Sequence, residues 1–139
     1  MSRKYLILVI IGLIAILFVV LALKWVYKPA KSNVASEKAV AQITAFDLVS
    51  AFTADEQKAN ADYLGKVVVV SGPIESIVED STTVSVTLKS PEDIAGVICS
   101  FNKNSIDLSV LTNGQQIKVK GKCDGYLLDV VLTKCSLVK

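Results

Sequence analysis

The fold is decided by a stretch in which apolar and basic residues alternate, Ile117-Lys118-Val119-Lys120-Gly121-Lys122-Cys123. Successive side chains of a β-strand point to opposite faces, so this period of two predicts a strand with one face in a core and one in solvent. The turn signal Asp124-Gly125 follows the strand. Residues 127–138 are then expected to return as the second strand of a hairpin.

The same alternation appears earlier in the chain. Three further strands are expected, over residues 67–74, 84–88 and 97–101. Ile77 breaks the parity of the first of them, which indicates a bulge. A short helix is expected over 104–111. The order of three strands, a helix and two strands is that of a five-stranded OB-fold barrel, and Gly72 and Gly121 fit the sharp bends of its strands.

Two helical segments are expected ahead of the barrel. Thr44 can cap the first, in which Phe46, Val49 and Phe52 share one face. The second covers residues 56–63, and Thr53 or Asp55 would begin it.

The N-terminal part of the chain reads as a membrane anchor. Residues 5–23 contain no charge and no proline. A helix of that length spans roughly 28 Å, which matches the hydrocarbon core of a bilayer. No small-x-small cleavage site follows, so a retained signal anchor is expected. Four residues are expected at the membrane interface: Lys24, Trp25, Tyr27 and Lys28.

The sequence therefore predicts three parts: a signal anchor and transmembrane helix over 1–27, a linker over 28–43, and an OB-fold domain with a helical lead-in over 44–139. The expected fold class is mainly β: a five-stranded OB-fold barrel with an N-terminal helical segment, preceded by one transmembrane helix. A single-pass topology is expected, with the N-terminus in the cytoplasm and the C-terminal domain outside it, in the periplasm.

Charge is divided unevenly along the chain. Five of the 15 basic residues flank the apolar run, whereas all 13 acidic residues lie at Glu37 or later. The C-terminal domain is therefore net acidic, although the whole chain carries +2. A net acidic domain gains nothing from general attraction to polyphosphate, which argues against a nucleic-acid ligand.

Catalytic and metal chemistry have little support in the sequence. The chain contains no histidine, the commonest general base and imidazole ligand. Its carboxylates form no recognisable catalytic constellation, and no two cysteines lie at metal-ligand spacing. We expect no catalytic residue, metal site or cofactor, and no enzymatic activity.

OB-folds bind oligonucleotides on the outer faces of their second and third strands, where single-strand binding needs aromatic and basic residues. Neither type occurs among the outward residues expected there: Thr83, Ser85, Thr87, Ile98 and Ser100. One basic surface remains. Lys118, Lys120 and Lys122, with Tyr126 beside them, could contact a polyanion or a lipid headgroup. The favoured interpretation of these lysines is a solvated strand face that discourages edge pairing.

Three cysteines, Cys99, Cys123 and Cys135, lie on expected strands. In an oxidising compartment two of them would be expected to pair. Cys135 is expected about nine residues beyond the position opposite Cys123, too far for a bridge. Cys99 would then be one member of any disulfide. Cys135 is favoured as its partner because the third and fifth strands of an OB barrel are neighbours, and Cys123 is the alternative.

Several short motifs occur in order along the barrel: Tyr63-Leu64-Gly65-Lys66, Val70-x-Gly72, Val97-x-Cys99-x-Phe101 and Gly114-x-x-Ile117-x-Val119-x-Gly121-x-Cys123-x-Gly125, with Cys135. Together, over 45–137, they resemble the tRNA anticodon-binding-like (tRNA_anti-like) OB-fold family. The resemblance implies a bacterial envelope protein with a signal segment or lipid anchor. It implies nucleic-acid binding by analogy of fold alone.

The expected function is that of a membrane-tethered, non-enzymatic OB-fold binding or assembly module at the bacterial cell envelope. Its expected partners are the lipid bilayer and either another envelope protein or a small ligand. The alternative is a protein that binds single-stranded nucleic acid or another polyanion.

Overall fold

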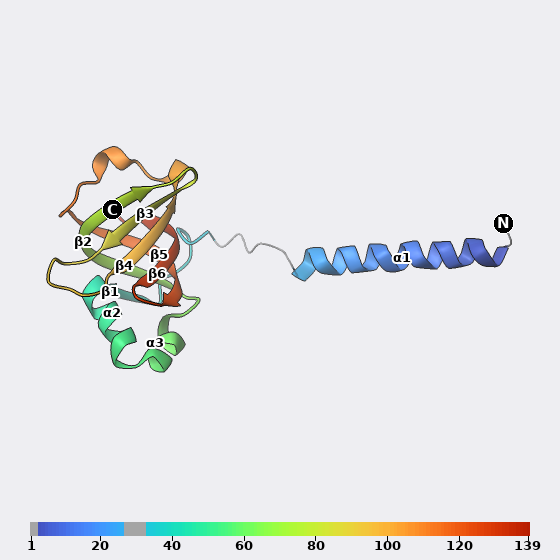
Figure 1. Ribbon diagram of the computed structural model, residues 1–139, viewed down its shortest axis with the longest axis horizontal. Coiled ribbons are helices and arrows are strands. Elements are labelled where there is room, and N and C mark those ends of the chain that lie inside the picture. The colour runs from blue at the N-terminus through green and yellow to red at the C-terminus, as the bar shows by residue number, and fades with distance from the viewer. Residues whose placement is uncertain (1–2, 27–32) are drawn as a thin grey trace. The chain divides into compact units, whose positions relative to one another are not determined.

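The structure is a computed structural model that describes residues 3–26 and 33–139 (Figure 1). The chain divides into two compact units, residues 1–32 and 33–139. Each unit is described by itself.

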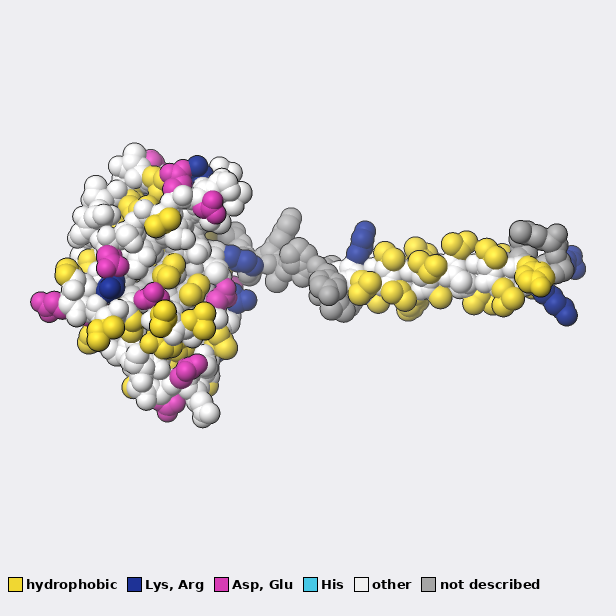
Figure 2. All heavy atoms as spheres, viewed as in Figure 1, with side chains coloured by type: hydrophobic (Ala, Val, Ile, Leu, Met, Phe, Trp, Pro, Cys, Tyr) yellow, Lys and Arg dark blue, Asp and Glu magenta, His cyan; other side chains and the backbone are white. Residues whose placement is uncertain are grey.

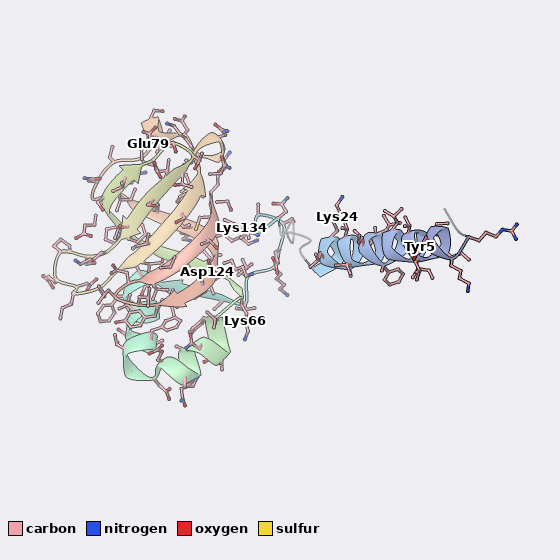
Figure 3. The ribbon with its side chains drawn as sticks, turned by 45° about the vertical axis from the view of Figure 1, so that its right-hand side comes forward. Tyr5, Lys24, Lys66, Glu79, Asp124 and Lys134 are labelled. Atoms are coloured by element: carbon pink, nitrogen blue, oxygen red, sulfur yellow. The ribbon has the colours of Figure 1, made fainter. Side chains whose placement is uncertain are left out.

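The described part of the first unit is one helix, α1 (Arg3–Val26). Its apolar side chains lie on all sides, with basic residues at both ends (Figure 2). Within the described residues it is the one helix long and apolar enough to cross a membrane. Lys24 is exposed in its last turn (Figure 3), and Trp25 belongs to the helix. The other two expected interface residues, Tyr27 and Lys28, lie outside the described residues.

The second unit is built on a closed five-stranded barrel, which confirms the OB fold. Antiparallel pairing joins β2 to β3, β3 to β4, β5 to β6, and β2 back to β5, while β4 and β6 pair in parallel. The strands are β2 (Val67–Glu79), β3 (Thr83–Leu88), β4 (Val97–Asn102), β5 (Gln116–Tyr126) and β6 (Val130–Leu137). Inward residues of all five strands form one core.

Strand β2 pairs with two other barrel strands along different parts of its length. Its first half pairs with β5 and its second half with β3. The register with β3 shifts between Ile74 and Ser76. This shift confirms the bulge expected from the parity of Ile77.

The segment between β4 and β5 differs from the helix expected over 104–111. It contains two short 3₁₀ turns, Lys103–Ser105 and Leu108–Val110. Asn102 and Asp107 explain the difference, because their side chains accept hydrogen bonds from the backbone N–H groups of Asn104 and Ser109. Such local bonds compete with a continuous helical ladder.

The expected linker, 28–43, is partly structured. The strand β1 (Ala41–Thr44) pairs in parallel with β2, from Ala41↔Val68 to Thr44↔Ser71. Val34 is buried, and the compact unit begins at Asn33. The apolar residues of this short stretch show no clear period, so the sequence pattern did not reveal the strand.

Two helices cover one end of the barrel: α2 (Ala45–Ala54) and α3 (Glu56–Tyr63) (Figure 1). Glu79 marks the opposite end in Figure 3. Thr44 caps α2 as expected, since its side chain accepts a hydrogen bond from the Asp47 N–H at 3.1 Å. The Asp55 side chain caps α3. Val49 and Phe52 face the core as expected, whereas Phe46 is 60% exposed and Leu48 is buried in its place.

Candidate binding groove

An apolar groove lies at the helix-covered end of the barrel. It has a volume of about 370 Å³, and its walls come from α2, from the β3–β4 loop (89–96) and from the end of β5. We call this site the apolar groove; its main lining residues are Phe46, Val49, Thr53, Ile94, Ala95 and Tyr126. Hydrophobic side chains gather on this part of the surface in Figure 2.

Aromatic rings pack together at the floor of the groove. The Phe52 ring, 1% exposed, stacks on Tyr126 with 5.7 Å between ring centroids and 23° between planes. Tyr63 of α3 also contacts Phe52, with 6.3 Å between ring centroids and a tilt of 42°. Ring pairs at these distances add attraction beyond the area that they bury. The contacts hold α2, α3 and β5 together beneath the groove.

Close approach of the backbone fixes the start of α2. A Cβ on Gly72 of β2 would lie 3.1 Å from the Ala45 Cβ, which is tighter than ordinary packing. Gly72 therefore makes room for α2, a role other than the strand bend expected from the sequence. Phe46 follows Ala45 on the outer side of the helix, where it borders both the apolar groove and a smaller hollow of about 260 Å³.

The β3–β4 loop, which forms the opposite wall, is joined to the β5–β6 loop by hydrogen bonds. The Asp129 carboxylate, in the β5–β6 loop (127–129), accepts a bond from the Gly96 N–H at 2.7 Å. The Val130 N–H donates to the Gly96 carbonyl at 3.0 Å. Within the β3–β4 loop, Ser90 and Asp93 close a turn with two further bonds. These loops are therefore held in place beside α2.

Large apolar side chains stand in solvent on these loops. Ile94 is 100% exposed, Leu127 is 87% exposed and Leu128 is 83% exposed. Ile94 lines the groove, and Leu127 and Leu128 follow Tyr126, which also lines it. Single exposed apolar residues are common, whereas a group of them marks an interaction site. The structure covers none of the three.

Acidic residues accompany the apolar ones. Glu92 and Asp93 line the groove, and the lining contains no basic residue among the described parts of the chain. Asp47 in the first turn of α2 and Asp124 near the end of β5 are exposed. A ligand at this site would meet apolar contacts bordered by negative charge.

The expected lysine row is a separate surface. We use this name for Lys118, Lys120 and Lys122 on β5, which pair with Ser71, Val69 and Val67 of β2. Lys118 is exposed and the other two are half-buried. The Lys120 Nζ donates to the Ala35 carbonyl at 3.1 Å, so one member of the row holds the segment that leads into β1.

Tyr126 does not lie with the lysine row. The register between β5 and β6 shifts from Cys123↔Leu132 to Gly125↔Val131, which leaves Asp124 as an extra residue. Such a bulge inverts the parity of the later residues of its strand. Tyr126 consequently pairs with the buried Val130 and turns toward Phe52. The turn lies three residues later than Asp124-Gly125, over 127–129.

The outer faces of β3 and β4 match the sequence expectation. The outward residues Thr83, Ser85, Thr87, Ile98 and Ser100 are exposed or half-buried, and none is aromatic or basic. Lys103, just past β4, pairs with Glu79 at the end of β2. This face therefore presents no stacking platform and no free cationic row.

The three cysteines are buried in the core, and the structure shows them without a disulfide. A hydrogen bond with the Cys135 side chain, together with burial, raises the pKa of Cys99 well above its usual range. Burial raises the pKa of Cys123. Among the described residues, no group of three histidine, cysteine or acidic side chains could hold a metal ion.

Sequence reasoning did not find the apolar groove. Its residues come from three segments that are far apart in the chain. The spacing of residues along the sequence therefore does not indicate that they lie close together. A signal does exist: Ile94 follows Pro91-Glu92-Asp93 in a loop, and Leu127-Leu128 occupies a turn. Apolar residues at turn positions have no core to enter.

A model of the tRNA_anti-like family matches residues 1–137. The chain belongs to the tRNA_anti-like family. This assignment confirms the resemblance drawn from the motifs of the barrel strands. No curated protein matches the chain.

Several solved structures are similar to this tRNA_anti-like protein. One is described as a "putative nucleic acid-binding lipoprotein" from Klebsiella pneumoniae subsp. pneumoniae MGH 78578: identity is 26%, the TM-score is 0.60, and the match covers 81% of this chain and 100% of that one. Another is yeast Stn1 and Ten1, at 13% identity and a TM-score of 0.48, with 75% and 65% covered. A third is a Replication Protein A heterotrimer bound to ssDNA, at 12% identity and a TM-score of 0.38, with 52% and 57% covered.

Proposed function

We propose that this chain is a membrane-tethered, non-enzymatic binding module whose apolar groove takes a polypeptide segment of another envelope protein. The observation that carries the proposal is the groove itself, about 370 Å³ in volume and bordered by the exposed side chains of Phe46 and Ile94. Apolar side chains bound there would leave water, which is the main source of affinity at such sites.

The charge around the groove specifies the kind of segment. Glu92 and Asp93 would repel an acidic ligand and attract lysine or arginine. We therefore propose a segment in which apolar residues alternate with basic ones. A ligand with only apolar groups would make no favourable contact with these two carboxylates.

The anchor supports the tethered part of the proposal. The helix α1 has the length and composition of a membrane span. We propose that the N-terminus lies in the cytoplasm and the OB domain outside it, in the periplasm. In that placement the domain would meet envelope proteins, and the bilayer would hold it at one surface.

Binding of single-stranded nucleic acid is the second candidate. It is favoured by the lysine row and by the description of the Klebsiella pneumoniae relative. The net acidic domain and the outer faces of β3 and β4 argue against it, since base stacking needs aromatic side chains.

A titration followed by methyl NMR separates the two candidates. The full chain in detergent micelles is titrated with a short peptide of leucine and lysine, with a matched peptide of leucine and glutamate, and with an oligothymidylate. We expect the leucine–lysine peptide to shift the methyl signals of Ile94, Leu127 and Leu128. Shifts confined to Ile117 and Val119 on β5, produced by the oligothymidylate alone, would contradict the proposal.

A further inference from the structure

The barrel has one short seam. Strands β4 and β6 close it through only three registered pairs, Val97↔Val130, Ile98↔Val131 and Cys99↔Leu132. The other described barrel ladders register five to seven pairs. Parallel pairing is also slightly less stable per residue than antiparallel pairing. Cys99 occupies the last pair, at the point where hydrogen bonding across this seam stops.

A bulge in β6 turns Cys135 inward just beyond that point. Lys122 pairs with Thr133 and Lys120 with Ser136, so two residues of β6 lie opposite Gly121. The first of them, Lys134, takes a left-handed backbone conformation with φ 51° (its position is labelled in Figure 3). That conformation is uncommon for a residue other than glycine and marks a position worth a functional explanation.

Gly121 provides the space that Cys135 occupies. A Cβ on Gly121 would lie 2.6 Å from the Cys135 Sγ, so any larger residue would displace the thiol. Cys135 is 5% exposed and Cys99 is 0% exposed. The bulge and the glycine together place one buried thiol against the other.

We propose that Cys99 and Cys135 form a disulfide that closes the β4–β6 seam of the barrel, and that Cys123 stays a thiol. The bond joins two strands that have run out of backbone pairing. It therefore crosslinks the barrel at the strand pair with the fewest backbone pairings, β4 and β6.

The register excludes a bridge between Cys99 and Cys123. Cys99 and Cys123 both pair with Leu132, from opposite sides of β6. Two strand spacings separate them by about 9–10 Å, whereas disulfide-bonded Cα atoms lie within about 7 Å.

Cys123 is also offset from Cys135. The residue opposite Cys135 is Gly121, two positions away along β5, which adds roughly 6–7 Å along the strand to one strand spacing. The separation along the hairpin is therefore far shorter than the nine residues expected from a turn at Asp124-Gly125. The side-chain contacts favour Cys99 as the partner: a hydrogen bond with Cys135 raises the pKa of Cys99, whereas burial is the main cause of the raised pKa of Cys123. Cys123 is left without a partner thiol.

The reaction is a thiol–disulfide exchange with a disulfide-bearing oxidant. Each thiol loses a proton, one sulfur–sulfur bond forms between Cys99 and Cys135, and the oxidant takes up the two electrons and two protons as two thiols. Thiolates are the attacking species. Because the folded barrel buries both groups, the exchange takes place while the chain folds.

Refolding of the full chain tests the proposal. The chain is unfolded with denaturant and reductant, then refolded in detergent micelles with oxidised or with reduced glutathione. After denaturation and alkylation we expect one alkyl group on the oxidised chain and three on the reduced chain. Proteolysis without reductant should give a linked pair of peptides that contain Cys99 and Cys135. Three alkyl groups after oxidative refolding, or a linked pair that includes Cys123, would overturn the proposal.

Matched variants add an independent readout. Cys123→Ser removes a thiol of the same core and should keep the linked pair, whereas Cys135→Ser should lose it. The closed loop of about 37 residues predicts that oxidised wild type melts about 10 °C or more above the reduced form. Equal melting temperatures of the oxidised and reduced forms would contradict a stabilising role for the disulfide.

Discussion

The lysine row and the apolar groove are two surfaces of one barrel with different construction. The lysine row is a single strand face, in which Lys118, Lys120 and Lys122 repeat every second residue along β5. The apolar groove combines α2, the β3–β4 loop and the end of β5. The row offers charge on a flat face, whereas the groove offers a concave apolar surface with its own acidic border.

This difference bears on what each surface can bind. A flat row of lysines attracts polyanions through a term that salt weakens. A groove with exposed apolar walls gains affinity by removing those walls from water, with less dependence on salt. Figure 2 shows hydrophobic side chains gathered at the helix-covered end of the barrel. The groove is therefore the better candidate for a selective site.

The largest expected effect concerns the floor of the groove. Phe52→Ala should lower the free energy of unfolding by about 3–5 kcal/mol, because Phe52 is 1% exposed and packs on Tyr126. Chemical denaturation of the full chain in micelles measures this loss. Phe46→Ala, at a ring 60% exposed on the groove wall, should cost at most about 0.5 kcal/mol. Similar losses for both variants would mean that the wall is part of the core.

An intermediate effect concerns the charge at the groove. Glu92→Lys should weaken binding of the leucine–lysine peptide by about threefold, since exposed charge pairs contribute about 0.2–1 kcal/mol. The loss should shrink as salt is added. Glu37→Lys, a charge reversal at another exposed position outside the groove, serves as the control. If both variants lost the same affinity for the peptide, the effect would come from the net charge of the domain and not from the groove.

The smallest expected effect lies in the lysine row. Lys120→Met should lower the free energy of unfolding by about 0.5 kcal/mol, because it removes the bond from the Lys120 Nζ to the Ala35 carbonyl. Lys118→Met, at an exposed position, should leave the unfolding midpoint unchanged. A larger loss at Lys118 would show that the row contributes to the fold in a way the contacts do not describe.

Local sequence patterns predicted most of the fold. Alternation located the barrel strands, and the parity of Ile77 indicated the bulge between Ile74 and Ser76. The prediction of a helix over 104–111 was wrong because the side chains of Asn102 and Asp107 accept hydrogen bonds from the backbone N–H groups two residues later. Phe46 was assigned to the wrong face of α2 because the periodic pattern allowed Phe46 or Leu48, and packing on the barrel selected Leu48.

The candidate site depended on contacts between distant segments. The bulge at Asp124 moved Tyr126 from the lysine row to Phe52, and one bulge inverts every later residue of a strand. The prediction that Cys99 lies near Cys135 came only from the strand order of an OB barrel. The bulge at Lys134 that turns Cys135 inward has no sequence signal, because lysine seldom adopts a left-handed conformation.

The most direct test measures peptide affinity for two variants of the full chain in micelles. The groove variant carries Phe46→Ser and Ile94→Ser, and the lysine-row variant carries Lys118→Glu and Lys122→Glu. A third protein with Val78→Ser and Val110→Ser controls for the loss of exposed apolar residues elsewhere on the barrel. We predict that the groove variant binds the leucine–lysine peptide at least about tenfold more weakly than wild type, while the other two retain wild-type affinity or better. Full affinity in the groove variant would contradict the groove as the binding site.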